Sequence, residues 1–180
     1  TKIKNQSYSI KAIDERNVSR KPKAPFNTSM LQQTANSQIN FSASQTMTVA
    51  QGLYMGVDIG LETVALITYM RTDSISLSDD SISILRDKIK SEYGEQYIPK
   101  DPIIYKTKKK SAQEAHEAIR PTDINIHPES IKDSLTDEQY KLYNLIWRRT
   151  ISSQMVNAET KLSTIRISNE ENSISLKATI

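Results

Sequence analysis

The stretch Ile67-Thr-Tyr69-Met-Arg71-Thr-Asp73-Ser74 places a phenol, a guanidinium and a carboxylate within five residues. A short apolar, β-prone run, Val64–Ile67, precedes it, and a helix start rich in Ser and Asp follows from Ser76. Side chains two positions apart in an extended segment point the same way, so Tyr69 and Arg71 are predicted to share a face. The pattern therefore predicts a tyrosine placed between a strand and a helix.

The chemistry of this stretch points to a phosphate ester. A phenol has a pKa near ~10 and is a poor nucleophile at neutral pH unless a cation or a base assists it. Arg71 can lower that pKa and can also hold a phosphate through two parallel hydrogen bonds. A phosphodiester is the natural electrophile, because arginine offsets charge on its non-bridging oxygens in the transition state. The alternative is a half-buried tyrosine beside a surface arginine, and this stretch alone leaves both interpretations open.

The composition limits the fold and several classes of chemistry. A length of 180 residues suits one domain or two small ones, and 37% hydrophobic residues favour thin or multi-lobed packing over one thick core. The charged fraction of 25% argues against wholesale disorder. The absence of cysteine excludes disulfides, thiolate zinc sites and cysteine nucleophiles. With only two histidines, a histidine-built metal site is not expected either.

The charge pattern is compatible with a nucleic-acid partner but does not establish one. The net charge is +3, and positive residues cluster at Arg20–Lys23 and Lys106–Lys110. Each cluster suits either a solvated loop or a nucleic-acid contact. No apolar run approaches the ~20 residues of a membrane span, and no signal-peptide pattern is present, so we expect a cytoplasmic protein without a membrane partner. Both ends fall within predicted strands, which leads us to expect a piece of a larger protein.

The periodicity of the first half predicts a strand followed by helices. Ser29 and Ser42 each open a capping box before a helical apolar stripe, and Gly56 is a plausible end for the second helix. This pair resembles a helix-turn-helix, a motif that serves either DNA binding or plain packing. The predicted elements are a strand over 3–13, a linker over 14–25, helices over 29–39 and 42–55, a strand over 64–67 and a helix from Ser78 to Gly94.

The second half predicts a strong helix and then two strands. Thr136 opens a third capping box, and the apolar stripe behind it predicts a core helix. Strands at both ends with helices between them predict an α+β fold, in which a mainly helical domain is inserted into a β-rich one. The predicted elements are a loop over 97–110, a short helix over 111–120 stopped by Pro121, the helix from Thr136, and strands over 162–167 and 174–180 joined by a turn.

His116 is a second candidate for chemistry. On the predicted helix over 111–120, neither Glu114 nor Glu117 faces His116, whereas Arg120 lies four residues away on the same face. A histidine beside an arginine suits binding of a phosphate or an acid. An ordinary surface histidine is the alternative.

Several stretches together resemble bacterial type IA DNA topoisomerase I, in that family's order and spacing. The Tyr69–Ser74 segment is the most specific of them, and the resemblance covers about residues 20–155. The stretches are Ala24–Gln33, Thr46–Tyr54, Leu66–Ser74, Gln113–Thr122 and Leu142–Arg148.

The resemblance implies an activity and three site residues. The family's tyrosine attacks single-stranded DNA to give a 5′-phosphotyrosyl bond and a free 3′-hydroxyl; a second strand passes, and the reaction reverses without ATP, which relaxes negatively supercoiled DNA. By position, Tyr69 matches the nucleophile, Arg71 the arginine that assists the cleaved phosphate, and His116 a histidine with a supporting role. The resemblance assigns no role to Asp73, Glu114, Arg120 or Arg148.

The resemblance also implies an architecture, a cofactor and partners. Residues 21–123 would form the helical domain that bears the tyrosine, inserted into a β-rich arch or gate domain of residues 1–20 and 124–180. The family's Mg2+ site lies in a Toprim domain that these residues do not contain, so we expect no metal on this chain and no relaxation by it alone. Expected partners are DNA, the remaining domains of the same protein and a second copy of the fragment, in a bacterial cytoplasm with the nucleoid.

Two other classes of function stay open at this stage. The helix pair and the lysine cluster suit a non-catalytic DNA-binding module. A structural scaffold that contacts only the rest of its own protein suits the same sequence.

Overall fold

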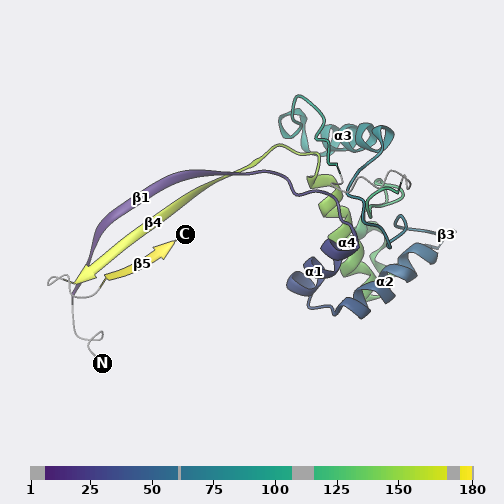
Figure 1. Cartoon of the computed structure of the whole chain (residues 1–180), viewed down its shortest axis with the longest axis horizontal. Helices are drawn as coiled ribbons and strands as arrows, with labels where there is room; N and C mark the ends of the chain where they lie inside the picture. Colours follow the sequence, from purple (N-terminus) through teal and green to yellow (C-terminus); the bar gives the residue numbers. More distant parts are fainter. Residues whose placement is uncertain (1–6, 61, 107–115, 170–174, 180) are drawn as a thin grey trace. The chain divides into compact units, whose positions relative to one another are not determined.

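The computed structural model describes residues 7–60, 62–106, 116–169 and 175–179, with helices and antiparallel strands (Figure 1). The chain divides into two compact units. One is formed by Thr1–Lys21 with Asn157–Ile180, and the other by Pro22–Val156. The predicted α+β fold is confirmed.

The first unit is a three-stranded antiparallel sheet in the order β1-β4-β5. Its strands are β1 (Tyr8–Arg20), β4 (Ala158–Asn169) and β5 (Ser175–Thr179). The two long strands pair along almost their full length, as Figure 1 shows, from Tyr8 opposite Asn169 to Arg20 opposite Ala158. Most described side chains of β1 are exposed, so this sheet has little core of its own.

The predicted linker over residues 14–25 is wrong for 14–20, which continue β1. This part of the strand is polar on both faces, so it lacks the alternation of apolar and polar residues by which a strand is detected. Its pairing comes from β4, a partner more than 130 residues away in the sequence. Exposed ion pairs between the two strands join Lys161 to Glu15 at 2.7 Å and Arg166 to Asp14 at 3.0 Å.

Within its described residues, the second unit contains four α-helices and one antiparallel pair of two-residue strands. The elements are α1 (Thr28–Ile39), α2 (Ala43–Met55), β2 (Val57–Asp58), β3 (Thr63–Val64), α3 (Asp79–Tyr93), α4 (Asp137–Ser152) and 3-10 turns at Glu95–Tyr97 and Pro128–Ser134.

Of the five predicted helices, four are present as α-helices, and three of these four begin at the predicted cap. The side chains of Ser42, Ser78 and Thr136 each accept a hydrogen bond from the backbone N–H three residues on. For α1 the predicted cap, Ser29, is wrong, and Asn27 caps the helix by accepting from the N–H of Met30 at 2.9 Å. The shift arises because Phe26 is held in an extended bridge with Ile119, and the helix begins directly after it.

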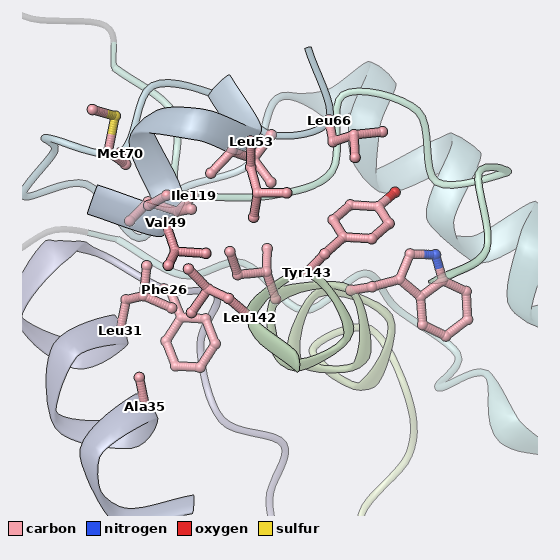
Figure 2. Close-up of a cluster of buried hydrophobic side chains, with 14 of the residues drawn as sticks. Phe26, Leu31, Ala35, Val49, Leu53, Leu66, Met70, Ile119, Leu142 and Tyr143 are labelled. Carbon is pink, nitrogen blue, oxygen red and sulfur yellow. The ribbon is translucent and has the colours of Figure 1, made fainter. Parts of the chain in front are cut away.

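The core of this unit is built around α4. Leu142, Tyr143 and Ile146 are fully buried, and Trp147 is 3% exposed, as the predicted stripe requires. Figure 2 shows Leu142 facing Phe26 of the chain before α1, while Tyr143 lies on the side of Leu66.

Two hydrogen bonds attach the chain before α4 to this helix. Trp147 Nε1 donates to the carbonyl of Ile124 at 3.0 Å, and Tyr143 Oη donates to the carbonyl of Ile126 at 2.7 Å. Residues 124–156 therefore pack within the helical unit. The predicted domain boundary after Asp123 is not where this structure divides, because α4 supplies the core of the unit that the earlier helices need.

Tyr143 makes the stability of this unit sensitive to high pH. Burial, with a smaller effect from the charge of Asp123, raises the pKa of Tyr143 far above its usual value. An unfolded tyrosine ionises near pH ~10, so the contribution of Tyr143 is complete below that pH and is lost as the pH rises above it. We expect the free energy of unfolding to fall above pH ~10, by at most about 1.4 kcal/mol per pH unit for this one proton.

Replacing Tyr143 with phenylalanine is expected to make that fall less steep. At pH 8 the variant should lose about 1 kcal/mol with its hydrogen bond to Ile126. Urea denaturation at pH 8, 9, 10 and 11 measures both effects, with the change of exposed Tyr97 to phenylalanine as the matched control. Equal slopes for wild type and the Tyr143→Phe variant between pH 10 and 11 would contradict this assignment.

Candidate active site

The segment after Ile67 alternates between exposed and buried side chains. Tyr69 is 43% exposed, and Arg71 and Asp73 are exposed, whereas Met70 and Thr72 are 1% and 6% exposed. The backbone bends at Thr68 and Met70, so this alternation shows that Tyr69 and Arg71 are both exposed on either side of buried Met70. That the two side chains share one face stays a prediction.

Thr28, the first residue of α1, holds the backbone of this segment. Its N–H donates to the carbonyl of Thr72 at 3.0 Å, and its Oγ1 donates to the carbonyl of Met70 at 2.7 Å. The same Oγ1 accepts from the N–H of Thr72 at 2.9 Å. One threonine therefore fixes the backbone on both sides of Arg71 and directly after Tyr69.

The two ends of the segment meet at Ala118. Thr68 Oγ1 donates to the carbonyl of Ala118 at 2.8 Å, and the N–H of Ala118 donates to the carbonyl of Ser76 at 2.9 Å. Residues 69–75 therefore form a loop that is closed at its base. We call this loop, residues 69–75, the tyrosine loop.

Residues 116–120 are extended, so the predicted helix over 111–120 is wrong in its described part; residues 111–115 lie outside the described residues. The backbone groups that a helix would use are taken by other segments. The N–H of Ile119 donates to the carbonyl of Phe26 at 2.7 Å, and the carbonyl of Arg120 accepts from the N–H of Thr68 at 2.9 Å. These pairings, distant in sequence, prevail over a local helical preference.

His116 and Arg120 consequently do not share a helical face. His116 is exposed and lies two residues before Ala118, at the base of the tyrosine loop. Arg120 instead pairs with Glu117, to which its Nε and Nη2 donate at 3.0 and 2.6 Å. The structure thus places the His116 segment beside the tyrosine loop, but not through the arrangement that the sequence predicted.

Glu117 connects this segment to the start of α3 and was not predicted. Its Oε1 accepts from the N–H of Ser78, the N-cap of α3, at 2.9 Å. Burial opposes ionisation of Glu117, but hydrogen bonds from Ser78 and Arg120 outweigh it and lower the pKa of the carboxyl. The carboxylate therefore stays ionised at neutral pH and joins the segment 116–120 to the start of α3. Helix N-termini favour nearby acidic side chains, so an acid was to be expected close to the start of α3. Nothing in the sequence indicated that this acid would come from the segment around Glu117.

Tyr54 is a second neighbour that sequence reasoning missed. It comes from the last turn of α2 and meets the Tyr69 ring edge to face, with ring centres 5.3 Å apart and an interplanar angle of 63°. Such aromatic contacts favour one ring orientation over others. No local pattern relates these two tyrosines.

Two polar groups at the exposed end of this site have no interaction partner within the described residues. Across residues 7–60, 62–106, 116–169 and 175–179, no hydrogen bond or ion pair is recorded for the Tyr69 hydroxyl or the Arg71 guanidinium. Both are carried on backbone that Thr28 and Ala118 fix. A fixed backbone that carries polar side-chain groups without partners suits recognition of a charged ligand.

The described residues lack two further kinds of feature. Within them, no group of three or more His, Cys, Asp or Glu side chains is placed to hold a metal ion. Among the same residues, no helix has the length and apolar character needed to cross a membrane. Of the predicted cluster Lys106–Lys110, only Lys106 is described, and it is exposed.

Comparison with solved structures relates this fold to one class of enzyme. Full-length topoisomerase I from Thermotoga maritima matches with a TM-score of 0.75 and 34% sequence identity, over 98% of this chain and 28% of that one. A family model described as DNA topoisomerase matches residues 1–180.

The chain therefore belongs to the DNA topoisomerase family. It is 49% identical to DNA topoisomerase 1 of Rickettsia felis over 98% of its length, and 43% identical to DNA topoisomerase 1 of Helicobacter pylori over 87%. It spans 23% and 21% of the lengths of these relatives.

Proposed function

We propose that this chain is the nucleophile-bearing part of a type IA DNA topoisomerase, and that Tyr69 cleaves and rejoins single-stranded DNA. In the complete protein this reaction relaxes negatively supercoiled DNA. The observation that carries the proposal is that Tyr69 and Arg71 are both exposed, two residues apart on a loop whose backbone is fixed by Thr28 and Ala118.

The reaction exchanges one ester for another. Tyr69 Oη forms a bond to the phosphorus of a phosphodiester, and the bond from phosphorus to the deoxyribose O3′ breaks. The phenol loses its proton and the departing O3′ gains one, so the products are a 5′-phosphotyrosyl ester and a free 3′-hydroxyl. Religation is the reverse exchange, and no ATP is consumed because the ester bond is conserved.

Arg71 stabilises the charge of this exchange. Its guanidinium has no carboxylate partner among the described residues and is exposed two residues from Tyr69, so it can donate two hydrogen bonds to the non-bridging oxygens. His116, at the base of the loop, would support binding of the same phosphate. Tyr54 limits the orientations of the nucleophilic ring.

The rest of the catalytic centre must come from other parts of the complete protein. The described residues offer no metal site, so no step is assigned to Mg2+ here, and the cation would be held by a Toprim domain elsewhere in the protein. The chain spans about a fifth of its relatives, which is compatible with a partial centre. We infer that residues 1–180 alone do not relax DNA.

The polarity of covalent capture tests the proposed reaction. The complete topoisomerase is incubated with a single-stranded oligonucleotide labelled at one end and then denatured in detergent. A 5′-phosphotyrosyl product retains the 3′-terminal label on the protein and releases the 5′-terminal label with the 3′-hydroxyl fragment. Retention of the 5′ label instead, or of neither label, would overturn the proposal.

A further inference from the structure

A groove of about 390 Å³ lies between the last turn of α1 and the polar side of α4. Three cations line it, namely Lys141, Arg148 and Arg149, and no acidic side chain does. The remaining polar positions include amides and a hydroxyl, from Gln38, Asn144 and Ser152. None of the residues of the tyrosine loop lines this groove.

Lys141 and Arg148 form a row along α4. Both are exposed, and seven residues separate them, which corresponds to two helical turns and a rise of about 10 Å. The nearest acid before them on the helix, Glu138, accepts a hydrogen bond from Gln45 of α2 at 2.6 Å. Within the described residues, neither Lys141 nor Arg148 forms an ion pair with a carboxylate.

Arg149 is held in a fixed orientation at the same groove. Its guanidinium stacks 4.2 Å from the ring centre of Phe26, and its Nη1 donates to the carbonyl of Ala24 at 3.3 Å. Within the described chain, no carboxylate pairs with this half-buried cation, and burial lowers its pKa. An anion bound in the groove would stabilise the charged form of Arg149, because several of its guanidinium N–H donors have no acceptor within the described residues.

We propose that this groove binds the phosphate backbone of DNA at a place separate from the tyrosine loop. That the ligand is DNA rests on the proposed function. A row of cations with amide and hydroxyl donors, without an aromatic platform among the lining residues, suits phosphates rather than bases. The contact is therefore independent of base sequence, and it holds DNA on the protein apart from the cleavage step.

A structural role for the same cations makes a different prediction. α1 has no basic residue in its last turn, so cations near its C-terminus could complement the helix dipole. In that case their removal would lower the melting temperature and leave DNA binding unchanged. The test must therefore measure both quantities.

The test compares two double variants of the complete topoisomerase that lose the same charge. Lys141→Gln with Arg148→Gln removes the row, and Arg149 is kept because it packs on Phe26. Lys88→Gln with Lys90→Gln is the matched control on α3, where each lysine pairs with a glutamate. Fluorescence anisotropy with a labelled 20-nucleotide single strand gives the affinity at several salt concentrations, and thermal unfolding gives stability.

The groove variant should bind about 25-fold more weakly at 0.1 M salt, since each lost phosphate contact on a single strand is worth about 0.7 of a decade there. The slope of log affinity against log salt should decrease by about 1.4. The control should match wild type in both. Equal affinity and equal slope for the groove variant and wild type would overturn the proposal that the groove binds DNA. The proposed function would survive that result if the complete protein still captured the 3′-labelled strand.

Discussion

Changing Tyr69 to phenylalanine in the complete topoisomerase is expected to abolish covalent capture of single-stranded DNA and relaxation of supercoiled DNA. The change removes only the hydroxyl oxygen that forms the bond to phosphorus, so the loss should exceed about 10³-fold. Because Tyr69 is 43% exposed and its hydroxyl has no recorded partner among the described residues, stability should change by less than about 0.5 kcal/mol. Detergent-trapped label on the protein measures capture.

The matched control is Tyr54→Phe, which removes a phenol hydroxyl beside the same ring. The edge-to-face contact between the two rings is kept in this variant, so capture should stay within a few-fold of wild type. Wild-type capture by the Tyr69 variant would show that another residue is the nucleophile. Loss of capture in the Tyr54 variant alone would move the reaction to the neighbouring tyrosine.

Changing Thr28 to valine is expected to slow capture by about 10- to 100-fold while DNA affinity stays close to that of wild type. The valine has nearly the same shape but lacks the Oγ1 that donates to Met70 and accepts from Thr72. The tyrosine loop would then be free to shift, and a displacement of about 1 Å at a reacting group costs about 10²-fold in rate. Thr28 touches no substrate in this account and acts by positioning Tyr69 and Arg71.

Thr28→Ser separates positioning from general damage. Serine keeps the hydroxyl and should restore the capture rate. If the threonine acted only through its shape, the valine variant would capture DNA faster than the serine variant. The readouts are the single-turnover rate of capture, the oligonucleotide affinity and the melting temperature. Equal capture rates for the valine and wild-type proteins would remove Thr28 from the account.

Much of the helical unit could be predicted from local sequence. Ser42, Ser78 and Thr136 lie in capping patterns, and the stripe through Tyr143 and Trp147 has the spacing of a core helix. These features depend on residues within one or two turns of each other, so the sequence carries them directly.

The parts that could not be predicted depend on partners distant in sequence. Residues 116–120 have a helical composition but pair with Phe26 and Thr68. Residues 14–20 look like a linker because their strand is polar on both faces, and only β4 makes them a strand. The contacts that fix the tyrosine loop belong to the same group, since Thr28 lies more than 40 residues before it.

The central claim is that Tyr69 Oη forms the bond to DNA, and peptide mapping of the trapped complex tests it most directly. After capture by the complete protein, nuclease treatment and proteolysis leave a nucleotide on the modified peptide, which mass spectrometry locates. We expect the nucleotide on Tyr69, linked through its 5′-phosphate. A nucleotide on Tyr54 or any other residue, with Tyr69 unmodified, would contradict it.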